Sequence, residues 1–286
     1  MTVTPSQGLD DLKDVMGAYN ALADRLQASQ QVLQREVARL NEELAEKNRQ
    51  LARKNRLEAL GEMAAGVAHE IRNPLGGIEL YAGLIAREAA DNPKVAQWAA
   101  KIQAATRNLS QTVGEILDFT RPLKPQMRAL ALGEIIDSAI ELASSAIEGK
   151  RIVVVREDKR GATVMADANL LQRGFLNVIL NAADAMQDGG TLTVRVAPTT
   201  LGGLDAWQVS FADNGKGIDP EDIGRIFDPF FTRKETGTGL GLAMTARIVG
   251  AHEGKLSASN AAGGGAVFTF TLAAGQLEGE RSKWHG

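Results

Sequence analysis

Residues 167–190 read DANLLQRGFLNVILNAADAMQDGG, and this stretch predicts one helix. Asp167 is a typical N-cap residue, and Asp188-Gly189-Gly190 supplies a turn that ends a helix. Asn177 and Asn181 are four residues apart, so they fall on one face of the predicted helix. Their neighbours are apolar, so the pair indicates either packing asparagines with internal partners or a ligand site. An amide oxygen is a suitable ligand for a phosphate-bound Mg²⁺.

Strands are predicted on both sides of this helix, in segments rich in β-branched and aromatic residues. A further helix is predicted over residues 134–147. Strands with helices between them, ending in segments that look antiparallel, indicate an α/β sandwich with helices on one face of the sheet. The predicted strands are residues 151–156, 191–197, 207–212, 255–259 and 266–272.

Two glycine-rich turns lie at the ends of predicted elements. DNGKG (213–217) follows a strand, and GTGLGL (237–242) opens a helix. Glycine lets the backbone approach a ligand closely, and a helix N-terminus presents N–H groups and a favourable dipole to phosphates. Either turn alone is as often structural as functional. Together with Asn177 and Asn181, they predict a nucleotide site.

Residues from about 9 to 119 have a helical pattern, and residues 121–125 are predicted to be a linker. Apolar residues at 33, 37, 40 and 44 follow the spacing of a coiled-coil seam, which predicts a parallel dimeric coiled coil, with a single solvated helix as the alternative. A helix over 57–87, a stop at Asp91-Asn92-Pro93 and a second helix to Phe119 predict a hairpin, with Pro93 in the first turn after an Asn92 cap. One hairpin has too little core, so two chains are expected to form a four-helix bundle.

The first helix of this hairpin carries AHEIRNPL (68–75). A lone histidine on a helix usually has no chemistry, but Glu70 can orient or deprotonate the imidazole of His69 for attack on phosphorus. Asn73 lies one turn along and can reach the same surface patch. Pro74 removes a backbone hydrogen bond and permits a kink. This segment therefore predicts a phosphoacceptor histidine.

These motifs resemble those of the sensor histidine kinases of two-component systems. AHEIRNPL resembles the family's phosphoacceptor box, NVILNAADA (177–185) its asparagine box and DNGKG its first glycine box. IFDPFF (226–231) is similar to the phenylalanine box, and GTGLGL to the second glycine box. All five motifs occur in the family's order between residues 57 and 272.

The resemblance implies a role for each matched position. His69 would accept the phosphoryl group of ATP, Glu70 would be its general base, and Asn73 would position the water that dephosphorylates the partner. Asn181 would bind Mg²⁺, and Asp213 would accept a hydrogen bond from the adenine amino group. The other residues implied around ATP are Asn177, Gly215, Gly217, Phe230, Phe231, Arg233, Lys234, Gly237, Thr238, Gly239, Leu240 and Gly241.

One position departs from many relatives, in which a lysine follows the second asparagine by three residues. Here that residue is Asp184, so the phosphate contact is expected from Lys216, Arg233 or Lys234. The lid between the glycine boxes, residues 218–236, is short. With VAHEIRNPL, it resembles the subgroup whose partners are response regulators that activate alternative-sigma-factor transcription.

The expected architecture is helical, then α/β. It comprises a coiled-coil input region (1–56), a dimerisation and phosphotransfer domain (57–125), an ATP-binding domain of the histidine kinase, gyrase and chaperone type (126–275) and a disordered tail (276–286). We expect a homodimer that phosphorylates His69 from ATP, passes the phosphoryl group to an aspartate of a response regulator receiver domain and also dephosphorylates that regulator. The ATP domain would swing on a linker at 121–125, and a signalling protein would act on the coiled coil.

Composition argues against several other classes. The absence of cysteine excludes disulfides and thiolate metal sites, and a net charge of −3 gives no case for nucleic acid. There is no apolar run of about 18 residues and no signal-peptide pattern, so a cytoplasmic protein without a membrane span is expected. Two alternatives remain. A gyrase- or chaperone-type ATPase would lack the His69-Glu70 motif, and a non-enzymatic coiled-coil scaffold would fail to bind ATP.

Overall fold

The computed structural model describes residues 30, 34, 36, 37, 39–41, 44, 71–89, 92–158, 161–234 and 237–275. The chain divides into two compact units, Met1–Met63 and Ala64–Gly286. In the first unit the described residues are helical and exposed, among them Val37, Leu40 and Leu44 of the predicted seam. The rest of the predicted coiled coil, His69, Glu70 and residues 276–286 lie outside the described residues.

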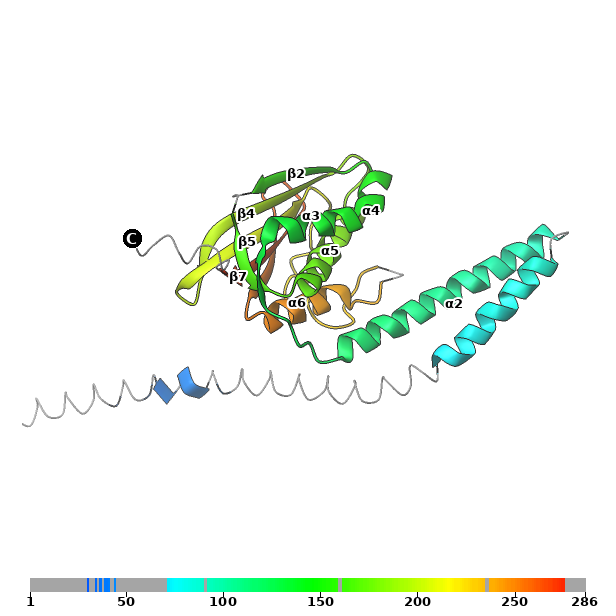
Figure 1. The fold of residues 1–286 in the computed structure, drawn as a ribbon, viewed down its shortest axis with the longest axis horizontal. Helices are drawn as coiled ribbons and strands as arrows, with labels where there is room; N and C mark the ends of the chain where they lie inside the picture. Colours follow the sequence, from blue (N-terminus) through cyan, green and yellow to red (C-terminus); the bar gives the residue numbers. More distant parts are fainter. Residues whose placement is uncertain are drawn as a thin grey trace, which may run out of the picture. The chain divides into compact units, whose positions relative to one another are not determined.

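The predicted hairpin is formed by helical residues 71–88 and by α2 (Pro93–Thr120) (Figure 1). Asn92 caps α2 as predicted, because its side chain accepts a hydrogen bond from Val95 N at 3.3 Å and Pro93 follows in the first turn. Many large apolar side chains of the hairpin are exposed, namely Ile71, Ile78, Leu80, Tyr81, Leu84, Ile85, Trp98, Ile102 and Leu109.

The second part of the unit is built on a five-stranded sheet in the order β2-β4-β5-β7-β6. Strand β2 (Val153–Asp158) pairs in parallel with β4 (Thr191–Leu201), and the other pairs, which involve β5 (Leu204–Asp213), β6 (Lys255–Asn260) and β7 (Ala266–Ala273), are antiparallel. All five predicted strands are present. The strands β1 (Arg128–Ala131) and β3 (Thr163–Ala166) form a separate two-stranded sheet that the sequence did not predict.

One face of the five-stranded sheet is covered by α3 (Leu132–Leu142), α5 (Ala168–Ala185) and α6 (Gly241–Ala251) (Figure 1). The single helix predicted over 134–147 was wrong, because the chain turns at Ala143 and a short α4 (Ser144–Gly149) follows. The two serines that open α4 bond readily to nearby backbone and weaken helix continuity. None of the described helices is long and apolar enough to cross a membrane.

The core fixes α5 against the sheet. Phe175 of α5 lies with its ring centroid 5.3 Å from that of Phe211 on β5 and 4.9 Å from that of Phe270 on β7. All three rings are buried, and Asp167 caps α5 by accepting a hydrogen bond from Leu170 N at 3.2 Å. Aromatic packing of this kind adds to the burial of apolar area. The helix that carries Asn177 and Asn181 is therefore held in a fixed position over the sheet.

Candidate functional site

A cleft of about 1330 Å³ lies between α5, the segment after β5 and the start of α6, with α2 contributing to its wall. Most predicted site residues line it, so positions more than sixty residues apart in the sequence meet here. Those residues are Asn177, Asn181, Asp213, Gly217, Phe231, Arg233, Lys234, Gly237, Thr238, Gly239, Leu240 and Gly241. Gly215 and Phe230 are not part of the lining, and Asn73 lies exposed on the hairpin.

The two asparagines of α5 have different partners. Asn177 Nδ2 donates to the carbonyl oxygen of Gly241 at 3.1 Å, which ties α5 to the start of α6. Asn181 Oδ1 instead accepts a hydrogen bond from the ammonium of Lys234 at 2.8 Å. Asn177 therefore behaves as a packing asparagine with an internal partner, one of the two alternatives predicted for the pair. Asn181 presents its side-chain oxygen to a cation.

Asp213 is the buried carboxylate of the cleft, with 4% of its surface exposed. Its Oδ1 accepts hydrogen bonds from Gly215 N at 2.9 Å and from Ala266 N at 3.2 Å. Burial raises the pKa of Asp213, because a buried carboxylate loses its hydration. Both of these bonds use Oδ1, so Oδ2 is the oxygen that a ligand donor would meet.

This raised pKa predicts a stability effect. The folded protein binds the Asp213 proton more tightly than the unfolded chain does, so ionised Asp213 lowers the free energy of unfolding at neutral pH. This decrease in the free energy of unfolding disappears as the pH falls through the raised pKa of folded Asp213 toward its pKa in the unfolded chain, about 3.9. We expect Asp213→Asn to unfold at a higher temperature than the wild type at neutral pH, in calorimetry without nucleotide. The difference in unfolding temperature between the variant and the wild type is expected to decrease as the pH is lowered. A difference that stays constant with pH would contradict the raised pKa of Asp213.

Gly215 and Gly239 are glycines for steric reasons. A Cβ on Gly215 would lie 2.6 Å from the carbonyl oxygen of Ala185. Gly239 has a φ of +70°, and a Cβ there would lie 2.5 Å from the carbonyl carbon of Phe230. Phe230 N also donates to the carbonyl oxygen of Gly239 at 3.1 Å. The second glycine motif is thus packed directly against the phenylalanine motif, which only a residue without Cβ permits.

The two basic residues of the predicted lid have separate partners. Arg233 makes two hydrogen bonds of 2.9 Å to the carboxylate of Asp222, and this pairing lowers the pKa of Asp222. Lys234 reaches α5, where its ammonium lies 2.6 Å from Asp184 Oδ2. Asp222 was not predicted as a site residue, because it belongs to no motif, whereas the departure at Asp184 marked that position as unusual.

The hairpin also contacts the cleft. Thr238 Oγ1 donates to Glu115 Oε2 of α2 at 2.7 Å. Near the end of α2, Arg247 of α6 lies over the ring of Phe119, 4.9 Å from its centroid, and donates to the carbonyl oxygen of Arg121 at 3.0 Å. Glu115 was not among the predicted site residues, because nothing in its local sequence distinguishes it from the other glutamates of the predicted helices.

Two family models match the chain. The family described as the His Kinase A (phospho-acceptor) domain matches residues 59–124. The family described as the histidine kinase-, DNA gyrase B- and HSP90-like ATPase matches residues 166–276. The first range contains the AHEIRNPL segment, and the second contains the asparagine motif and both glycine motifs.

Curated proteins are similar over about three quarters of the chain. The signal transduction histidine-protein kinase AtoS of Escherichia coli (strain K12) is 34% identical over 218 residues, which is 76% of this chain and 35% of AtoS. The sensor histidine kinase ZraS of Klebsiella oxytoca is 37% identical over 217 residues, 76% of this chain and 46% of ZraS. The chain therefore spans less than half the length of these relatives.

Solved structures are also similar. The histidine kinase ThkA in complex with the response regulator protein TrrA matches with a TM-score of 0.58 at 28% identity, over 78% of this chain and 64% of that chain. Full-length ShkA in complex with AMPPNP matches with a TM-score of 0.64 at 24% identity, over 76% of this chain and 46% of that chain. The second likeness concerns the fold alone.

Proposed function

We propose that this chain, a member of the histidine kinase family by both its phosphoacceptor and its ATPase domain, phosphorylates its own His69 from ATP. It then passes the phosphoryl group to an aspartate of a response regulator. The observation that carries the proposal is one cleft that gathers Asn181, Asp213 and the glycine loop 237–241. This cleft follows, in the same chain, a matched phosphoacceptor domain that contains His69. That domain argues against the gyrase- and chaperone-type alternative, which has no phosphohistidine.

In this proposal ATP is bound through its adenine at one end of the cleft and through its phosphates at the other. The adenine amino group donates to Asp213 Oδ2, since Oδ1 already accepts two backbone hydrogen bonds. The phosphates lie at the N-terminal end of α6, where the loop 237–241 presents backbone N–H groups and the helix dipole favours negative charge. The match of residues 166–276 to the histidine kinase-, DNA gyrase B- and HSP90-like ATPase family supports ATP as the ligand of this cleft.

Asn181 is the residue that would hold Mg²⁺. Its Oδ1 already lies 2.8 Å from a positive charge, the ammonium of Lys234, so the oxygen faces a position that suits a cation. When bound, the ion would neutralise charge on the phosphates.

His69 supplies the nucleophile. A nitrogen of its imidazole attacks the γ-phosphorus, the bond from that phosphorus to the β–γ bridging oxygen breaks, and ADP leaves. Glu70 takes up the ring proton and orients the imidazole. Asn73 positions the water in the opposing reaction, hydrolysis of the phosphorylated regulator. The ATP domain brings its nucleotide to His69 by moving on the linker 121–125.

The working unit in this proposal is a homodimer. The exposed apolar residues of the hairpin support it, because an unpaired surface of this kind is what a second hairpin covers in a four-helix bundle. Residues 1–56 would carry the signal from a bound protein as a coiled coil. The complex of ThkA with the response regulator protein TrrA supports a receiver domain as the partner. The short lid and the VAHEIRNPL segment support the subgroup paired with alternative-sigma-factor regulators.

Incubation of the purified protein with Mg²⁺ and γ-labelled ATP tests this function. We expect label on the protein that is lost in acid and kept in alkali, as a phosphoramidate should be, and transfer of that label to a receiver domain. Protein that binds ATP but takes up no label would contradict the kinase proposal. Protein that binds no ATP would favour the scaffold alternative.

A further inference from the structure

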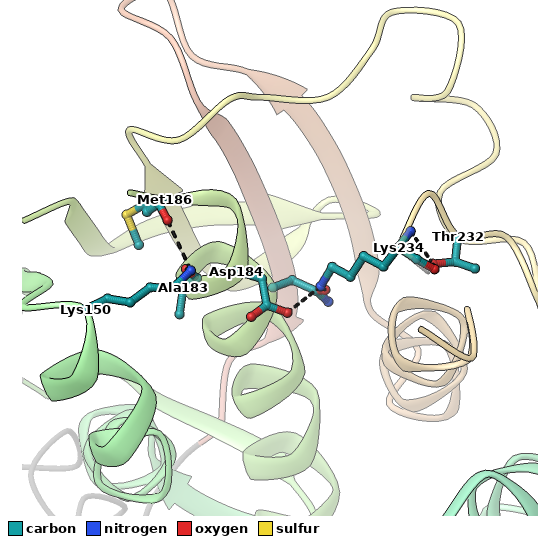
Figure 2. A network of polar contacts seen from close by, with 7 residues as sticks. Lys150, Ala183, Asp184, Met186, Thr232 and Lys234 are labelled. Carbon is teal, nitrogen blue, oxygen red and sulfur yellow. Dashed lines mark hydrogen bonds and ion pairs between the residues drawn. The ribbon is translucent and has the colours of Figure 1, made fainter. Parts of the chain in front are cut away.

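Lys234 extends from the lid to the last turn of α5. Its ammonium lies 2.8 Å from Asn181 Oδ1 and 2.6 Å from Asp184 Oδ2, so two oxygens on one helix face hold a single positive charge. Figure 2 shows this side chain stretched across the gap between the lid and the helix. Lys234 and Asp184 therefore form an ion pair that joins the lid to the helix.

The helix side of this contact is fixed. Lys150 Nζ donates to the carbonyl oxygens of Ala183 at 2.7 Å and Met186 at 3.2 Å, on the other side of Asp184 (Figure 2). Ala183 belongs to the last turn of α5 and Met186 is its C-cap residue, and carbonyl groups at this end of a helix have no partners within the helix. Lys216 N donates to the carbonyl oxygen of Ala185 at 3.3 Å. Asp184 therefore projects from a turn whose backbone is held by contacts on both sides.

The lid side is a tight turn. Lys234 N donates to Thr232 Oγ1 at 3.0 Å, and Gly237 N donates to the carbonyl oxygen of Lys234 at 3.3 Å. The neighbouring Arg233 is engaged with Asp222 inside the lid. The two adjacent cations thus have different functions, since Arg233 stabilises the lid itself and Lys234 joins the lid to α5.

The ammonium of Lys234 is hydrogen-bonded to Asn181 Oδ1, the oxygen that would ligate the metal. An ammonium in hydrogen-bond contact with Asn181 Oδ1 and a divalent ion on the same oxygen would repel one another strongly at such short range. Binding of the metal–nucleotide complex therefore requires Lys234 to leave Asn181. Its departure leaves the Asp184 carboxylate without its ammonium, directly beside the position of the incoming ion.

We propose that Asn181 and Asp184 form a cation seat that Lys234 fills in the nucleotide-free protein and that a divalent ion fills in the ATP complex. The proposal rests on the proposed function, since it assigns Asp184 to the metal site of that ATP complex. Lys234, once released from the seat, is free to contact the phosphates. The seat thereby couples lid position to metal binding, with Asp184 as the residue common to both states.

Mn²⁺ binding to the nucleotide-free full-length chain tests the seat, followed by electron paramagnetic resonance of the free ion. Mn²⁺ takes the same oxygen ligands as Mg²⁺. Lys234→Met is expected to tighten Mn²⁺ binding about fivefold, the upper end for a partly exposed ion pair. Adding Asp184→Asn to Lys234→Met is expected to cancel this gain. Lys255→Met is the matched control, since it removes the same charge at an exposed position outside the cleft, and it is expected to leave Mn²⁺ binding within about twofold of the wild type.

Equal Mn²⁺ affinity in Lys234→Met and the wild type would overturn the seat, and so would an equal gain in Lys255→Met. A gain in Lys234→Met that persists after Asp184→Asn would also overturn it. Thermal unfolding of each variant shows that it is folded. The outcome of this experiment is independent of the test of the proposed kinase activity. That activity is tested by ATP binding and labelling of the wild type, without these variants.

Discussion

Asp213→Asn is expected to weaken ATP binding at least about a hundredfold, because a site built to accept a hydrogen bond would then present a donor. Asparagine has nearly the same shape as aspartate, and its Oδ1 can still accept from Gly215 N and Ala266 N. Its Nδ2 replaces Oδ2 and would face the adenine amino group, so that two donors oppose each other. Isothermal titration with ATP gives the change in affinity.

A matched control for this substitution is Asp188→Asn, which removes the same charge at an exposed ion pair with Arg151. Exposed pairs of this kind contribute little, so ATP affinity is expected to stay within about twofold. Inosine triphosphate, which has an oxygen in place of the amino group, is expected to lose much less affinity than ATP in the Asp213 variant. Similar losses for both nucleotides would place the adenine contact elsewhere.

Gly239→Ala is expected to weaken ATP binding about tenfold or more. Residues with a Cβ disfavour the left-handed φ of +70° by roughly 1–2 kcal/mol, and the added methyl would also overlap the backbone of Phe230 at 2.5 Å. A backbone neighbour cannot move aside as a flexible side chain can, so the loop that presents N–H groups to the phosphates must shift. Titration with ATP and the rate of label uptake both report the effect.

Gly224→Ala is the control for this second substitution. Gly224 lies in the neighbouring lid (218–236), and a Cβ there meets nothing within 4 Å. ATP affinity is expected to change by less than about twofold, since substitutions away from packed or strained positions have small effects. If Gly224→Ala weakened binding as much as Gly239→Ala, general disturbance of the lid would explain both results, and the close approach at Phe230 would not be the cause.

Local patterns predicted the elements that position the site. Asp167 and Asn92 cap their helices as their side-chain chemistry predicts, and all five strands of the main sheet have enough β-branched and aromatic residues to be recognised. The strands β1 and β3 have four residues each, which is too short for an alternating pattern to stand out. The break at Ala143 was missed because helical periodicity continues across it.

Pairs of charged side chains were less predictable. Arg233 and Lys234 are adjacent in the sequence and were both expected near the phosphates, yet one pairs with Asp222 and the other with Asp184. The second pair spans 50 residues and depends on how the lid lies over α5, which no local pattern encodes. The unusual Asp184 could be seen in the sequence, but its cationic partner could be chosen only from the structure.

The position of the phosphoryl group tests the kinase proposal most directly. The chain has three histidines, His69, His252 and His285. His252 is buried, with its Nδ1 2.7 Å from the carbonyl oxygen of Ile248 and its Nε2 accepting from Asp167 N at 2.9 Å, so neither nitrogen is available as a nucleophile. His285 lies outside the described residues.

We would therefore map the phosphorylated residue by tandem mass spectrometry at neutral to alkaline pH, after incubation with Mg²⁺ and ATP, beside a His69→Gln variant. Phosphate on His69 in the wild type, and none in a variant that still binds ATP, is the predicted result. Phosphate on any other residue, or ATP turnover with His69 unmodified, would contradict it.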